Sequence, residues 1–116
     1  MATSILYSGD NGTCRIDSLF SGNISKRETK RITLNKDYKT LVAITVIWNN
    51  TGGSVKVDDA NFTRVNWFNN NYGDRLQWTH SLWTYGKSKK DSTVSILLDP
   101  AGSSTEWSSA ILVGIY

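Results

Sequence analysis

Apolar and polar residues alternate along residues 76–85 with the period of two that is typical of β-strands. One face of this segment carries Leu76, Trp78, His80 and Leu82, and the other carries Gln77, Thr79, Ser81, Trp83 and Tyr85. Residues 40–48 instead form a nearly unbroken run of apolar and β-branched side chains, which predicts a strand buried on both faces. Further strands are predicted over residues 29–34, 54–57, 61–68, 93–98 and 107–116.

Turn-forming residues separate these predicted strands. The segments 49–53 and 99–104 are rich in Asn, Gly and Ser, and the second contains Pro100, the only proline; these residue types favour tight turns. No window has an apolar period typical of a helix. The pattern therefore predicts an all-β chain of about seven to nine strands, folded as a jelly-roll-like antiparallel β-sandwich that forms one domain over residues 1–116.

Composition excludes several classes of protein. Cys14 is the only cysteine among 116 residues, so neither an internal disulfide nor a multi-cysteine metal site can form. The net charge of +3 is small, and the basic clusters at 26–31 and 87–90 are interrupted or followed by acidic residues, so we expect solvated loops and no nucleic-acid partner. We also expect no membrane insertion and no signal peptide, because no long apolar run occurs.

Candidate catalytic groups are few. His80 is the only histidine, and its neighbours Trp78 and Leu82 favour a packed side chain over a general base. Asp58 and Asp59 are adjacent, so they would point to opposite faces of a strand or lie in a bend. Neither a His pair, a calcium-loop motif nor a glycine-rich phosphate loop is present. We therefore predict a protein that is not an enzyme and needs no cofactor or metal.

The segment 65–85 combines aromatic rings with short amide side chains, which is the combination that stacks on sugars and pairs their hydroxyls. We expect a hairpin loop over residues 69–74, Trp78 in the core with Leu76 and Leu82, and Trp83 and Tyr85 on a more polar face. That polar face fits a ligand site, a subunit contact or the core of a second sheet. The candidate ligand-binding residues are Trp67, Asn69, Asn70, Asn71, Tyr72, Asp74, His80, Trp83 and Tyr85.

Two further stretches carry a resemblance to a family. Residues 19–48 run from the turn Phe20-Ser21-Gly22 through Ile-Thr-Leu and Tyr38-Lys39 into the long apolar strand, and the chain closes with the sequence AILVGIY. This layout resembles the distal domains of tail fibres and receptor-binding proteins of tailed phages and prophages. Residues 49–90 match no pattern, and the shared motifs are loose.

The resemblance implies a β-sandwich at the tip of a homotrimeric fibre, in the virion tail, that binds a glycan or protein on a bacterial surface. Our first hypothesis is therefore a receptor-binding domain that recognises bacterial carbohydrate. A structural trimerisation or decoration module of a virion and a free-standing lectin remain the alternatives.

Overall fold

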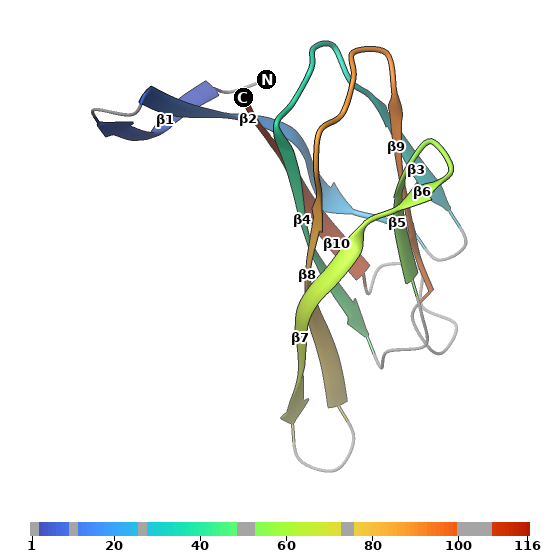
Figure 1. The fold of residues 1–116 in the computed structure, drawn as a ribbon. Helices are drawn as coiled ribbons and strands as arrows, with labels where there is room; N and C mark the ends of the chain where they lie inside the picture. Colours follow the sequence, from blue (N-terminus) through green and yellow to red (C-terminus); the bar gives the residue numbers. More distant parts are fainter. Residues whose placement is uncertain (1–2, 10–11, 26–27, 49–52, 73–75, 100–107) are drawn as a thin grey trace.

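The computed structural model describes residues 3–9, 12–25, 28–48, 53–72, 76–99 and 108–116, and it describes side chains at 15–25, 28–48, 53–67, 78–99 and 108–116. Its ten strands form two sheets, and all neighbouring strands within each sheet run antiparallel (Figure 1). The larger sheet has the order β1 (Thr3–Gly9), β2 (Gly12–Asn23), β10 (Ser108–Ile115), β4 (Thr40–Trp48), β8 (Leu76–Tyr85) and β7 (Thr63–Tyr72). The smaller sheet has the order β3 (Thr29–Thr33), β9 (Thr93–Leu98), β5 (Gly53–Val57) and β6 (Ala60–Asn61).

The hydrophobic core lies between the two sheets. Alternate residues of β4 and β10 meet alternate residues of β5 and β9, and their side chains are almost fully buried. The largest members of this core include Tyr38, Leu41, Leu112, Ile96 and Leu98. The predicted antiparallel β-sandwich is confirmed, and it has more strands than the sequence pattern predicted because β1, β2 and β6 are added.

Strand β4 differs from its prediction. Leu41, Ala43, Thr45 and Ile47 are buried, but Ile44 on the opposite face is 45% exposed. The apolar run therefore does not mean that both faces of β4 are buried within this chain, because the smaller sheet covers only one of them. The apolar side chains on its other side, Ile44 among them, are not covered by the smaller sheet.

Strand β8 has the predicted alternation, but the assignment of its faces was wrong. Thr79 and Ser81 are buried, and Trp83 and Tyr85 pack against the core, whereas Leu82 is exposed. The ring of Tyr85 lies 5.4 Å from that of Phe62, centroid to centroid. The small hydroxyl side chains of Thr79 and Ser81 fit between the two sheets, and the rings of Trp83 and Tyr85 pack on the same side of β8. The face of β8 that looks more polar in the sequence is therefore its inner face.

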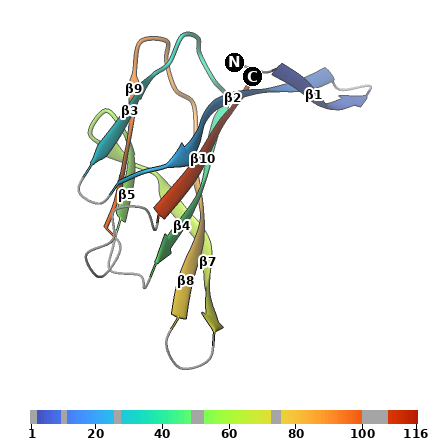
Figure 2. The same cartoon turned by 180° about the vertical axis from the view of Figure 1, so that it is seen from behind.

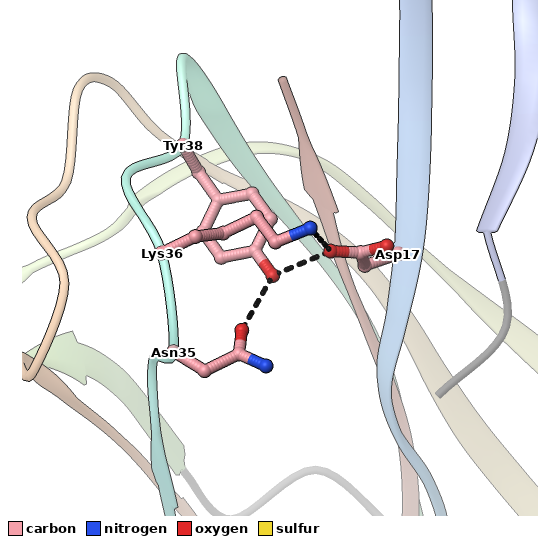
Figure 3. A network of polar contacts seen from close by, with 4 residues as sticks. All are labelled: Asp17, Asn35, Lys36 and Tyr38. Atoms are coloured by element: carbon pink, nitrogen blue, oxygen red, sulfur yellow. Dashed lines mark hydrogen bonds and ion pairs between the residues drawn. The ribbon is translucent and has the colours of Figure 1, made fainter.

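A polar network joins the middle of β2 to the β3–β4 link (Figure 3). Tyr38, which is 1% exposed, donates its hydroxyl proton to Asp17 Oδ2 at 2.8 Å, and Lys36 Nζ lies 3.1 Å from the same oxygen. Lys36 Nζ also lies 4.0 Å from the ring centroid of Tyr116. Because Asp17 is buried and ionic, these two donors compensate for the water that it lost.

Gly114 in β10 makes room for the Tyr38 ring. A Cβ atom at Gly114 would lie 2.5 Å from Tyr38 Cε1 and 2.9 Å from Cγ, and closer still to Cδ1. Those separations are far below the 3.5–4.0 Å of ordinary carbon contacts. The glycine is therefore required by close packing rather than by its backbone conformation.

Two ribbons of strands extend beyond the region where the sheets face each other. Strand β1 pairs only with β2, and together they project sideways from the sandwich (Figures 1 and 2). The far ends of β7 and β8 reach past the smaller sheet in both views. The β7–β8 ribbon contains most of the candidate ligand-binding residues, so its exposure decides which of them are accessible.

Candidate functional site

The amide-rich segment is part of a strand, not a hairpin loop as predicted. Residues 69–72 belong to β7 and pair with residues 76–79 of β8, with Asn70 opposite Trp78. The side chains of Asn69, Asn70, Asn71 and Tyr72 lie outside the described residues, as does the whole of Asp74. Backbone pairing across an antiparallel ribbon overrode the turn preference of consecutive asparagines.

Trp83 and Tyr85 do not form an accessible ligand face. The indole Nε1–H of Trp83 donates a hydrogen bond of 2.9 Å to Thr45 Oγ1, and Thr45 is 0% exposed. Both rings pack against the core between the sheets. Their placement among hydroxyl residues in the sequence had suggested a polar surface, but the smaller sheet covers that side of β8.

Among the predicted site residues whose side chains the structure describes, Trp67 is the most exposed. Its side chain is 50% exposed, and the register places it opposite Ser81, on the inner side of the ribbon. The guanidinium Cζ of Arg64 lies 4.9 Å from the Trp67 ring centroid and 5.7 Å from that of Trp83. This geometry is that of a cation–π contact, so Arg64 connects the exposed ring to the packed one.

Asn66 lies directly before Trp67 on β7. Its Oδ1 accepts a 2.8 Å hydrogen bond from the backbone N–H of Trp67. A bulge between Arg64 and Asn66 shifts the register against β8, which turns Asn66 outward while Arg64 and Trp67 stay on the inner side. A half-exposed indole and a guanidinium thus lie together on the inner side of an edge strand, and the Asn66 amide lies on its outer side.

The opposite side of the larger sheet, which faces away from the smaller sheet, is called the outer face here. His80 lies on it and borders a shallow pocket of about 300 Å³. Trp67 and Ser81, whose side chains the register directs inward, border the pocket as well. The pocket is lined by Ile44, Asn66, Trp67, His80, Ser81 and Leu82. His80 is half-buried, and it lies beside aliphatic side chains, as its sequence neighbours predicted.

Three aliphatic residues form an exposed line across the middle of the outer face. Ile111 of β10 is opposite Ile44 of β4, and Ile44 is opposite Leu82 of β8. Their side chains are 45%, 45% and 36% exposed, respectively. We call Ile111, Ile44 and Leu82 the apolar row.

The two rows of residues that flank the apolar row contain valines and small or neutral polar residues. Val113, Val42 and Thr84 are opposite one another on one side, and Ser109, Val46 and His80 on the other. At one end of the face the rings of Trp48 and Trp78 meet edge to face, with centroids 5.1 Å apart. The sequence signal for this surface was the unbroken apolar run of β4, which was interpreted as burial within the chain.

The described residues of the two basic clusters lie in different kinds of structure. Lys87, Lys89 and Lys90 are exposed, while Ser88 between them is buried and pairs its backbone with Tyr38. The first cluster contributes Lys30 and Arg31 to strand β3, where Lys30 Nζ lies 5.5 Å from the Phe20 ring centroid. The solvated-loop prediction therefore fits the lysines around Ser88 better than it fits β3.

Acidic and metal-ligating residues are dispersed in the described part of the chain. Asp58 has a φ of 50° in the turn between β5 and β6, and its Oδ1 accepts a 3.0 Å hydrogen bond from the Thr93 N–H. Among the described residues, no group of three or more His, Cys, Asp or Glu side chains is placed to hold a metal ion. Within the same residues, no helix has the length and apolar composition needed to cross a bilayer.

No protein-family model, curated protein or solved structure matches this chain. The functional assignment therefore rests on the chain's own residues and geometry.

Proposed function

We propose that this chain is a non-enzymatic receptor-binding module of a phage-like tail fibre, and that it recognises bacterial surface carbohydrate on the β7–β8 ribbon. The observation that carries the proposal is Trp67, an indole that is 50% exposed on a ribbon projecting past the smaller sheet. Burying a tryptophan removes about 150–250 Å² from water, so half-exposure leaves a substantial apolar surface for a ligand.

The neighbours of Trp67 provide the polar part of such a site. A sugar presents C–H faces that stack on an indole and hydroxyls that pair with amides and guanidinium groups. Arg64 precedes Trp67 by three residues on β7 and lies on the same side of the ribbon, with its guanidinium Cζ 4.9 Å from the ring centroid. Asn66 lies directly before Trp67 and points to the other side of the ribbon. Among the described residues Arg64 has no ion-pair partner, so its charge favours sugars that carry a carboxylate or phosphate group.

A glycan array that includes neutral, carboxylated and phosphorylated sugars tests this proposal. We expect specific binding that Trp67→Ala abolishes and that Arg64→Gln weakens for acidic sugars more than for neutral ones. Val65→Ala is the matched control, because Val65 is 55% exposed on the same strand and presents no ring. Binding that survives Trp67→Ala, or a broad array without any binding, would refute a carbohydrate site at this residue.

A structural role in an assembly is the second candidate, and the apolar row favours it. Exposed aliphatic residues in the centre of a sheet face are typical of surfaces that another protein covers. On this reading the exposed rings and aliphatics mediate assembly and need no sugar. Binding to the array separates the two candidates, because a purely structural module would bind no sugar.

A further inference from the structure

We propose that the outer face of the larger sheet is a self-association surface, and that a second copy of this chain packs on it around a two-fold axis near Ile44. Asn66 and Trp67 border the pocket at the β7 edge of this face, but self-association through the face does not require carbohydrate binding. Its starting point is β4, whose sequence is that of a strand buried on both faces although this chain covers only one.

The charge distribution favours a second copy over a charged partner. The apolar row and its two neighbouring rows contain no Lys, Arg, Asp or Glu, although the chain carries 23 such residues, 13 basic and 10 acidic. Two identical copies with a net charge of +3 repel each other wherever basic residues meet. A face without charges lets them approach without burying like charges or unpaired ions.

The shape of the outer face is also suited to contact with the same face of a second copy. A two-fold contact requires a protrusion and a matching hollow on the same surface. Ile111 is exposed on β10, and the pocket of about 300 Å³ lies across β4, beside Leu82 and His80. Because β4 lies between β10 and β8, a two-fold axis that runs along β4 in the plane of the contact brings the Ile111 side of each copy over the pocket of the other.

The area of the face is sufficient for a modest dimer. The five strands β2, β10, β4, β8 and β7, spaced about 4.8 Å apart with about seven residues each at about 3.4 Å per residue, span about 24 by 24 Å. That is on the order of 600 Å² per copy, or about 1,200 Å² in total, at the lower end of stable protein interfaces. We therefore expect an equilibrium between one and two copies rather than a permanent dimer.

A two-fold pair fits this face better than the homotrimer that the family resemblance implies. The central strands of one sheet face can pack broadly against those of one other copy, whereas three copies around a three-fold axis cannot all bring these strands together. The centre of the face, where Ile44 lies, would then be the part furthest from full burial. In the two-fold pair this exposed centre lies at the axis and is covered by the second copy.

The test is the molecular mass of the purified chain by sedimentation or light scattering between about 1 µM and 1 mM, a range that brackets interfaces of this size. The wild-type chain and the variants Ile44→Glu and Leu82→Glu are compared. Thr33→Glu, at an exposed position of the smaller sheet, is the control with the same added charge. Far-ultraviolet circular dichroism and thermal unfolding verify that each variant keeps the fold.

We expect the wild type and Thr33→Glu to reach twice the mass of one chain. Each outer-face variant should raise the dimer dissociation constant about 100-fold, because the change occurs twice in a two-fold pair and each copy contributes about tenfold. Because Ile44 lies on β4 and Leu82 on β8, one variant still tests the interface if the other misfolds. A single-chain mass at every concentration, a dimer that is indifferent to both folded variants, or a trimer would overturn the proposal.

Discussion

Gly114→Ala tests whether the Tyr38 ring is locked in the place where the structure has it. The new methyl group would need about 1 Å more space than the ring leaves, judged from the separations of 2.5 and 2.9 Å to Cε1 and Cγ. Tyr38 is buried, its hydroxyl is bonded to Asp17, and the Tyr116 ring lies 6.0 Å away edge to face. The ring can therefore move aside only by giving up that hydrogen bond.

The expected loss has two parts. Overpacking of a buried site costs about 1–3 kcal/mol, and a hydrogen bond to a charged group contributes about 1.5–3 kcal/mol. We expect Gly114→Ala to lower the free energy of unfolding by about 3–5 kcal/mol, a large share of the stability of an ordinary domain. Equilibrium unfolding in urea, followed by tryptophan fluorescence, measures it.

Gly86→Ala is the matched control, because a Cβ atom at Gly86 meets nothing within 4 Å. We expect its effect to stay within about 1 kcal/mol. A second comparison uses Tyr38→Phe, which removes the hydroxyl but keeps the ring. In that background the cost of Gly114→Ala should fall by about 1.5–3 kcal/mol, because no hydrogen bond remains to be broken. Equal costs at Gly114 and Gly86 would refute the packing described here.

Two further predictions concern the same core. Burial and then the hydrogen bond to Asp17 raise the pKa of Tyr38 above its ordinary 10.0, and the hydrogen bond to Asp17 raises the pKa of Lys36. Because the unfolded tyrosine ionises at lower pH than the folded one, its contribution to stability is complete below about pH 10 and declines as the pH rises further. The difference in unfolding free energy between wild type and Tyr38→Phe should therefore shrink between pH 9 and pH 11, roughly the range around the unfolded pKa; a constant difference would contradict the assignment. Trp83→Phe removes the donor to buried Thr45 and should cost about 1–3 kcal/mol, whereas Trp67→Phe should change stability by less than about 0.5 kcal/mol, both measured by urea unfolding. Equal costs at Trp83 and Trp67 would mean that the two rings are not divided between core and surface.

Much of the fold followed from local patterns. The alternation in residues 76–85 and the apolar periodicity of residues 93–98 and 107–116 correspond to β8, β9 and β10. A period of two needs no knowledge of the partner strand, since successive side chains of any strand point to opposite faces. The pattern also grouped Trp78, His80 and Leu82 correctly on one face of β8.

The choice between the two faces could not be made from the pattern. The face with Thr79, Ser81, Trp83 and Tyr85 looks more polar than the face with Trp78 and Leu82, yet it is the one that the smaller sheet covers. Burial depends on which side of the larger sheet β5 and β9 occupy, and the alternation within β8 does not specify that side. As a result, two of the nine candidate ligand-binding residues, Trp83 and Tyr85, belong to the core.

The sequence by itself determined that the chain is built of antiparallel strands, because side-chain alternation and turn residues are local properties. It also determined that β4 is apolar on both sides. Only the tertiary structure decided that one of those sides stays open, that Trp67 rather than Trp83 is accessible, and that Gly114 must be a glycine. Each of these depends on how the strands and sheets pack in three dimensions, which no local pattern specifies.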